Sequence, residues 1–190
     1  METEPAVSWS ANPTFDDRPT DLKLQLEHGC FYVHRDVLER SCDYFKAMFN
    51  SSMIEQTQEV IQLHDVNYLS FMFLVKAFYT DSLQCERDLE ELFLVAETAH
   101  MLQVNQSLHN QCLEYFKDII TSENCFLIMK FADEFGIQDI YNYARRFCLA
   151  YFIDLRYESS FLEITESQLI NYLSDDNLCI DHEAEVCEHL

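Results

Sequence analysis

The spacing of apolar and polar residues changes several times along the first third of the chain. Residues 22–27, LKLQLE, alternate between apolar and polar, which is typical of a strand with one buried face. Gly29 supplies a turn and CFYVH continues as a second strand, so this region predicts a hairpin. From Arg35 the apolar spacing fits two short helices interrupted near Ser41, and EVIQLHDV predicts a third strand.

Beyond residue 66 the spacing is helical. Segment 67–80, NYLSFMFLVKAFYT, is apolar nearly all round, which predicts a central, buried helix. Gly136 is placed to end a later helix as its C′ glycine. Apolar residues three or four apart predict further helices at 86–102, 108–119, 122–136 and 138–152, with weaker patterns at 157–163 and 166–173. We therefore expect an α+β fold, a small sheet surrounded by helices, followed by an all-α extension from about residue 120.

Composition supports this division. The chain has 190 residues, with 15 Phe and 10 Tyr, so it has the apolar side chains needed for a core. All three prolines lie among the first twenty residues, which leaves the rest free of the strongest helix breaker. We expect a flexible tail over residues 1–20, one domain over 21–120 and a helical region over 121–190.

The formal charge is −22, which opposes binding to nucleic-acid phosphates and to anionic membranes. A basic or apolar protein partner is easier to attract, although the acidity can equally serve solubility alone. METEPAVSWS lacks the basic start and apolar run of a signal peptide, and the longest apolar stretch, FMFLV, is too short to span a bilayer. We therefore expect the eight separated cysteines to be reduced and mostly buried.

Known catalytic and cofactor motifs are missing from the sequence. Two isolated glycines cannot form a glycine-rich phosphate loop, and neither H-E-x-x-H nor G-x-S-x-G occurs. No nucleophile lies beside a base, so we expect no catalytic residue and no cofactor, and an enzyme is the least favoured class. The His34–Arg35 pair is better explained structurally. The hairpin can bring Asp21 towards Arg35 as a structural charge pair.

One segment near the end of the chain contains zinc-type ligands. CIDHEAEVCEH offers Cys179, His182, Cys187 and His189. These two ligand pairs lie closer together than the pairs of the usual zinc modules, so we expect no metal.

A longer stretch carries a family resemblance. FYVHRDVLERSCDYFKAMFNSSMIEQTQEVIQLHDV closely resembles the BTB (POZ) domain of Kelch-like proteins, and FYTDSL, AETAHMLQV and NQCLEYF extend the match. NCFLIMKFADEFGIQDIYNYARRFCLAYF resembles the start of the BACK region that follows BTB in that family. The resemblance covers residues 21–190, which contain no Kelch repeats. It implies a BTB/POZ fold and a partial BACK-like helical region.

The resemblance also implies a function. Such proteins are substrate-recognition adaptors of cullin-3 RING ubiquitin ligases, which bind cullin-3 through the BTB domain and perform no catalysis themselves. The alternative is a non-catalytic BTB scaffold that oligomerises without a cullin. The substrate is unknown, and we expect a cytoplasmic protein that also enters the nucleus.

Candidate cullin-binding residues follow from the family pattern. Cullin-binding members use a hydrophobic residue, any residue, then Glu, and Met53 and Glu55 occupy that pattern. Ser52 and Glu55 also fit a capping box, in which Glu55 stabilises a helix start. The segment that extends the cullin groove suggests four further residues, although most apolar residues at this spacing belong to a core: Phe116, Cys125, Phe126 and Met129.

The family commonly forms two-fold dimers, so the resemblance implies a homodimer. Many members have an amphipathic helix before the first strand, where this chain has SWSANPTFDDRPT with two prolines. We therefore expect a dimer weaker than the family norm. Asp81 stands where the family commonly has Gly, and Asp tolerates the left-handed backbone that the turn requires.

Overall fold

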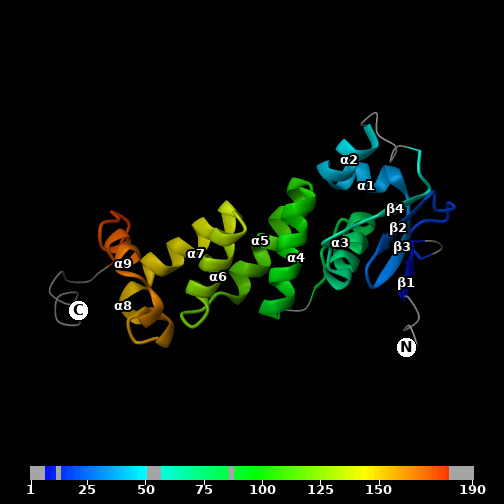
Figure 1. The fold of residues 1–190 in the computed structure, drawn as a ribbon. Coiled ribbons are helices and arrows are strands. Elements are labelled where there is room, and N and C mark those ends of the chain that lie inside the picture. The colour runs from blue at the N-terminus through cyan, green and yellow to red at the C-terminus, as the bar shows by residue number, and fades with distance from the viewer. Residues whose placement is uncertain (1–6, 12–13, 51–56, 86–87, 180–190) are drawn as a thin grey trace. The chain divides into compact units, whose positions relative to one another are not determined.

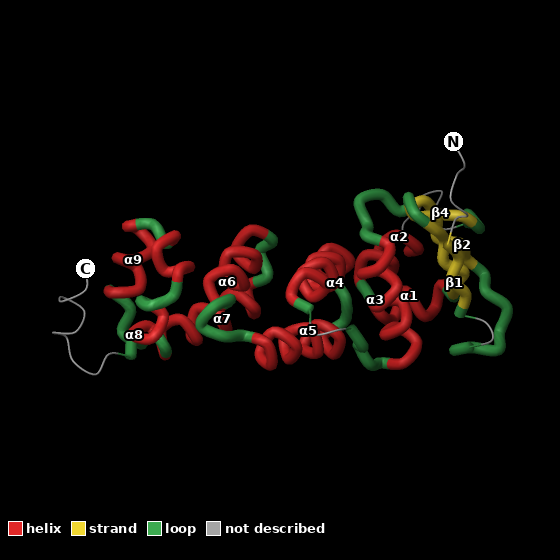
Figure 2. The backbone as a smooth tube through the Cα atoms, turned by 90° about the horizontal axis from the view of Figure 1, so that it is seen from below, coloured by secondary structure: helices red, strands yellow, loops and turns green. Residues whose placement is uncertain are grey.

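The structure, a computed structural model, describes residues 7–11, 14–50, 57–85 and 88–179. The chain forms two compact units, Met1–Tyr115 and Phe116–Leu190, and each is described by itself. Figure 1 labels the elements, and Figure 2 shows that the strands belong to the first unit while the second is helical. The α+β architecture expected from the sequence is confirmed.

A four-stranded sheet forms one side of the first unit. The strands run in the order β1-β3-β2-β4. Their bounds are β1 Val7–Ser10, β2 Leu22–Leu26, β3 Gly29–Val33 and β4 Val60–Gln62. The expected antiparallel β2–β3 hairpin is present, with Leu22 paired to Val33, and β4 adds to β2 in parallel. Gly29, expected in the turn, is instead the first residue of β3. Leu22, Leu24 and Leu26 are buried, so one face of β2 belongs to the core.

Strand β1 corrects the expected loose tail for residues 7–11. Val7–Ser10 pairs in parallel with β3, and Ala11, just beyond the strand, is fully buried. The Trp9 ring lies 6.0 Å from the Phe31 ring and 6.1 Å from the Tyr79 ring. The apolar residues of this segment follow no regular spacing. Their partners lie on a strand and a helix distant in sequence, so the sequence does not reveal these contacts.

Five helices complete the first unit or continue from it: α1 Arg35–Ser41, α2 Asp43–Asn50, α3 Tyr68–Thr80, α4 Leu89–Leu102 and α5 Gln106–Ile119. The Asn67 side chain caps α3, and the Asp88 side chain caps α4. Asp81 follows the last residue of α3, and its φ of 52° confirms the expected left-handed turn.

The core of the first unit is centred on α3. Phe71, fully buried on α3, meets the Phe31 ring edge-on at 5.0 Å and lies 6.4 Å from the Phe45 ring. One side chain of α3 thus joins the sheet to α2. Burying each such aromatic stabilises the fold by about 1.5–3 kcal/mol.

The second unit is a series of helices: α6 Cys125–Glu134, α7 Gln138–Ala150, α8 Phe152–Leu155, a 3₁₀ turn at Ser159–Glu163 and α9 Glu166–Leu173. Gly136, at φ 68°, makes the left-handed turn between α6 and α7. Thr165 and Gln168 form a capping box at the start of α9. Helix α8 was not expected, and the helix expected at 157–163 is instead the 3₁₀ turn. Among the helices of the described ranges, none has the length and apolar character that a membrane crossing requires.

Candidate protein-interaction surface

The elbow between α1 and α2 is anchored to the turn that follows α4. Cys42, between the two helices, forms an isolated antiparallel bridge with Val104. The Asp43 N–H donates to the Gln103 carbonyl at 3.0 Å. This bond ties the start of α2 to the turn after α4, and α2 packs against α4.

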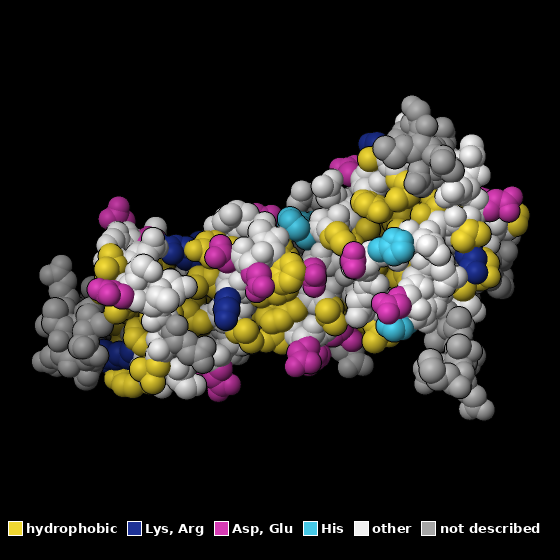
Figure 3. Space-filling view, viewed as in Figure 1, with side chains coloured by type: hydrophobic (Ala, Val, Ile, Leu, Met, Phe, Trp, Pro, Cys, Tyr) yellow, Lys and Arg dark blue, Asp and Glu magenta, His cyan; other side chains and the backbone are white. Residues whose placement is uncertain are grey.

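One face of α2 is buried, and among the described residues the other face is exposed. Phe45 and Phe49 point into the core, whereas Tyr44 keeps 39% of its surface exposed. The Tyr44 ring meets Phe45 edge-on at 5.3 Å, which limits its motion. A supported, exposed tyrosine is a side chain enriched at the centres of protein interfaces. On the face shown in Figure 3, acidic side chains are scattered rather than gathered into one patch.

The leading candidates from the sequence lie just beyond this helix. Met53 and Glu55, together with Ser52 of the alternative capping box, fall within 51–56, outside the described residues. The chain enters that segment directly from the C-terminal end of α2.

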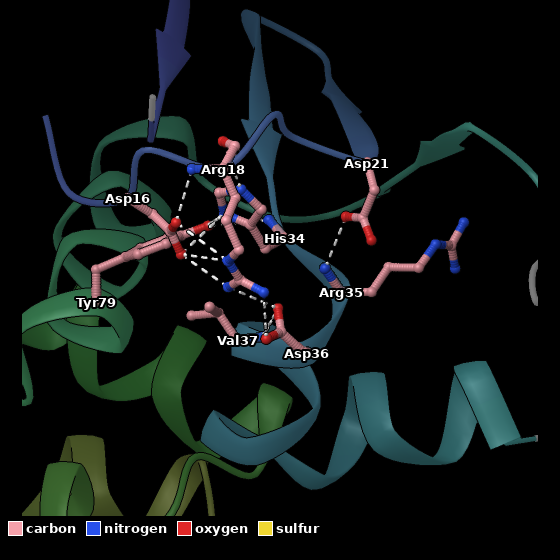
Figure 4. A network of polar contacts seen from close by, with 8 residues as sticks. All are labelled: Asp16, Arg18, Asp21, His34, Arg35, Asp36, Val37 and Tyr79. Carbon is pink, nitrogen blue, oxygen red and sulfur yellow. Dashed lines mark hydrogen bonds and ion pairs between the residues drawn. The ribbon is translucent and has the colours of Figure 1, made fainter. Parts of the chain in front are cut away.

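His34, the most suggestive catalytic side chain by type, is held as a structural residue (Figure 4). It is 2% exposed, and its backbone N–H donates to the Tyr79 hydroxyl at 2.9 Å. Nδ1 lies 2.9 Å from that same oxygen, and Nε2 lies 3.1 Å from the Arg18 carbonyl. One tautomer satisfies every group: the Tyr79 O–H donates to Nδ1, and Nε2–H donates to Arg18. Both ring nitrogens are therefore occupied within the fold.

Arg18 joins the segment before β2 to the start of α1. Its guanidinium pairs with Asp16 at 2.7 Å and with Asp36 at 3.0 Å, as Figure 4 shows. Hydrogen bonds from Arg18 lower the pKa of Asp16 to about 2 and also lower that of Asp36, while both carboxylates raise the pKa of Arg18. The cluster is an ion-pair network that holds the N-terminal segment in place.

Asp21 and Arg35 are neighbours in the structure. The Asp21 carboxylate accepts a hydrogen bond from the Arg35 backbone N–H at 3.0 Å, and so satisfies a donor at the start of α1. The Arg35 guanidinium extends away from Asp21 in Figure 4, donates to the Gln58 carbonyl and lies 4.7 Å from the centre of the Phe49 ring. The contact between the pair therefore runs through the backbone of Arg35.

The four remaining candidates lie inside the second unit. Phe116 and Cys125 are fully buried, while Phe126 and Met129 are 7% and 6% exposed. The Phe116 ring stacks on the Phe131 ring, with the ring centres 6.3 Å apart. The Met129 Sδ accepts a hydrogen bond from the Tyr172 hydroxyl at 3.0 Å. These contacts are those of core residues.

A cavity of about 650 Å³ opens between α6, α7 and α9, and Phe126 and Met129 reach its wall. Arg145 also lines it, pairs with Asp175 at 2.7 Å and lies 5.4 Å from the centre of the Tyr172 ring. Apolar and charged side chains thus share this wall, and the guanidinium charge is already balanced.

The described residues offer no group of three or more metal-type ligands close together. Of the zinc-type set at the end of the chain, Cys179 is exposed, and the other three lie outside the described ranges. Burial raises the pKa of the Cys42 thiol to about 12, so this thiol is unreactive at neutral pH.

Known protein families share this combination of a small mixed sheet covered by helices and a helical unit that follows it in the chain. Residues 12–120 match the family model described as BTB/POZ domain, and residues 125–190 match that described as BTB And C-terminal Kelch, or BACK. The chain belongs to the BTB–BACK family, whose members are adaptors and scaffolds rather than catalysts. The BTB match begins earlier than residue 21, where we expected that domain to start.

Three curated relatives illustrate the similarity. Kelch repeat and BTB domain-containing protein 8 of Xenopus tropicalis is 31% identical over 173 residues, 90% of this chain and 28% of the relative. Kelch repeat and BTB domain-containing protein 2 of Homo sapiens is 32% identical over 170 residues, 89% of this chain and 27% of the relative. Kelch-like protein 21 of Danio rerio is 30% identical over 163 residues, which are 86% of this chain and 26% of the relative. The chain therefore spans less than a third of the length of these relatives.

Proposed function

We propose that this chain is the cullin-3-binding part of a substrate adaptor for a RING ubiquitin ligase. The observation that carries the proposal is α2. It has a buried face, an exposed Tyr44, and a start bonded to the turn after α4, and it leads into the Met53-x-Glu55 pattern. A BTB domain followed directly by a BACK region supports the same role.

The adaptor acts through proximity. It holds a substrate beside the ubiquitin-conjugating enzyme that the cullin recruits, which raises the effective concentration of substrate lysines without any bond chemistry by the adaptor. Two of the relatives named above carry Kelch repeats by name, and this chain spans 28% and 27% of them. The proposal places the protein in the cytoplasm and also in the nucleus.

A non-catalytic scaffold that oligomerises through its BTB domain remains the second candidate, because the fold serves both roles. Calorimetric titration of the full chain with the N-terminal domain of cullin-3 separates them. We expect saturable binding with one cullin per chain. The scaffold role would instead be favoured if calorimetry detects no heat of binding and the two proteins do not co-elute at high protein concentration.

A further inference from the structure

Arg35 contacts three separate segments of the first unit, one through its backbone and two through its side chain. The Asp21 carboxylate accepts from its backbone N–H at 3.0 Å, at the start of α1. Its guanidinium extends away from Asp21 in Figure 4 and reaches the end of α2 and the residues that precede β4. A substitution of the side chain therefore leaves the bond at the start of α1 in place.

The contact with α2 is made over an aromatic ring. The guanidinium carbon lies 4.7 Å from the centre of the Phe49 ring, inside the distance of about 6 Å over which a cation is attracted to an aromatic face. Phe49 is the last residue but one of α2, is 4% exposed, and stacks on Phe45 with the ring centres 5.7 Å apart. Arg35 thus holds the last turn of α2 at a ring that belongs to the core.

The contact with the chain before β4 is a hydrogen bond. Arg35 donates from Nη2 to the Gln58 carbonyl. The next residue, Glu59, accepts from the Lys23 N–H at 2.9 Å, where β4 begins to pair with β2. Strand β4 has three residues and lies at the end of the strand order, so among the described strands it pairs with β2 alone. The Arg35 bond adds a second attachment just before this short strand.

One side chain therefore holds both ends of the connection from α2 to β4. Phe49 and Gln58 are nine positions apart in the chain, and both contact the same guanidinium. Arginine suits this arrangement because its planar group can lie over a ring and donate from its edge at the same time, which the compact ammonium group of lysine cannot do. In the sequence, the Met53-x-Glu55 pattern lies between these two points.

We propose that Arg35 is a positioning residue of the cullin-binding surface, which it organises by holding the end of α2 beside the entry to β4. This inference rests on the proposed function of that surface. The side chain sets the separation between the two ends of the connection before the partner arrives. Such pre-organisation strengthens binding because less conformational freedom is lost when the complex forms. Arg35 acts through Phe49 and Gln58 and does not need to touch the cullin.

A positioning role differs measurably from a purely structural one. If Arg35 only stabilised the fold, its loss would lower the melting temperature, and affinity would fall only as far as the folded fraction falls. The pairing of β4 with β2 and the bond from Asp43 to the Gln103 carbonyl do not involve Arg35, so the fold should survive its replacement. The decisive comparison is therefore between affinity and stability in the same variant.

The test compares Arg35→Ala and Arg35→Lys with Arg40→Ala, which removes an exposed arginine from the same helix. Calorimetry with the N-terminal domain of cullin-3 gives the affinity, and circular dichroism gives the melting temperature. Hydrogen-exchange mass spectrometry of the full chain without cullin gives the protection of amides at 46–50 and 57–62.

We expect Arg35→Ala to bind cullin-3 about tenfold more weakly, the effect of losing one hydrogen bond made by a charged group. Its melting temperature should change little, and exchange should be faster at both ranges. Arg35→Lys, which keeps a donor but loses the planar face, should recover part of the affinity. Arg40→Ala should match the wild-type chain in all three measurements.

Unchanged exchange at both ranges in Arg35→Ala would overturn the proposal, and so would wild-type affinity in that variant. A loss of affinity that only follows a fall in melting temperature would overturn it as well, because it would assign Arg35 to stability alone. A wild-type chain that binds no cullin-3 would remove the proposed function and with it the cullin role of Arg35. The exchange measurement would then still decide whether this side chain holds the two segments.

Discussion

Arg18 and Asp36 pair at 3.0 Å across eighteen positions of sequence, and this contact joins the segment before the first hairpin to the first helix. Both side chains are more than half exposed, so the pair adds little to global stability. Its effect is local, because the same guanidinium also holds Asp16.

Replacing Arg18 should therefore loosen the N-terminal segment selectively. In Arg18→Ala, we expect faster amide exchange at 7–11 and 14–20, with little change in the melting temperature of the whole chain. Hydrogen-exchange mass spectrometry measures this, with Arg40→Ala, which removes another exposed arginine, as the matched control. Unchanged exchange at these residues would show that β1 pairing and the Trp9 contacts hold the segment by themselves.

The same network has a defined pH dependence. The pKa of Asp16 falls from its ordinary 3.8 to about 2, so its stabilising contribution is fully present above pH 3.8. It is lost as the pH drops towards 2, when the folded carboxylate takes up its proton. We expect carboxyl NMR titration to give Asp16 a midpoint near 2, and Arg18→Ala to return it towards 3.8. A wild-type midpoint near 3.8 would contradict the ion pair.

The core of the first unit should be sensitive to the centre of α3. Phe71→Ala should lower its free energy of unfolding by about 3–5 kcal/mol, because it removes a buried ring that contacts Phe31 and Phe45. Leu69→Ala, on the same helix but 59% exposed, should cost less than about 0.5 kcal/mol. Urea denaturation followed by circular dichroism compares the two. Equal losses would mean that α3 does not centre the core.

Cullin-3 affinity should depend on the residues that follow α2. Met53→Asp combined with Glu55→Arg removes an apolar anchor and reverses a charge, and should cost on the order of 2 kcal/mol or more, over tenfold in affinity. Calorimetry measures the loss, while circular dichroism should stay unchanged. The control is Leu162→Asp, at a leucine of the second unit that is 86% exposed.

A single substitution separates partner binding from helix capping at Glu55. Glu55→Gln keeps a side chain that suits a capping box but removes the charge. We expect weaker cullin-3 binding at unchanged stability. Full affinity in Glu55→Gln, together with lower stability in Ser52→Ala, would assign Glu55 to the cap instead.

Self-association should be weak and favoured by salt. Each copy carries a formal charge of −22, and salt screens repulsion beyond about 8 Å at physiological ionic strength. Sedimentation equilibrium over protein and salt concentration should therefore show a dimer that becomes more populated as salt rises. A monomer at high protein and high salt concentration would contradict this expectation.

The parts of the fold that the sequence predicts are those whose partners are near in the chain. The β2–β3 hairpin is readable because Leu22, Leu24 and Leu26 alternate just before the turn at Glu27 and His28. The left-handed backbone at Asp81 is expected because the family commonly has Gly at that position. Strand β1 has no such signal, since it pairs in parallel with a strand beyond the intervening β2.

The candidate interaction surface could likewise be predicted only where its residues are near one another in the chain. The pattern of Met53 and Glu55 is readable because it is contiguous, whereas the Arg18 contacts with His34 and Asp36 join distant segments and leave no spacing signal. Burial of Phe126 and Met129 fits the core alternative, because helical periodicity identifies an apolar face without saying what covers it.

The position of the sheet in the chain has a consequence for synthesis on the ribosome. All four strands of the described part lie within Val7–Gln62, but α3, which covers their inner face through Phe71, ends only at Thr80. At roughly 5–20 residues per second, the apolar face waits on the order of a second or more for its cover. During that interval the nascent chain presents Phe31 and its neighbours uncovered. Chaperones that recognise aromatic strands would have their best opportunity before α3 emerges.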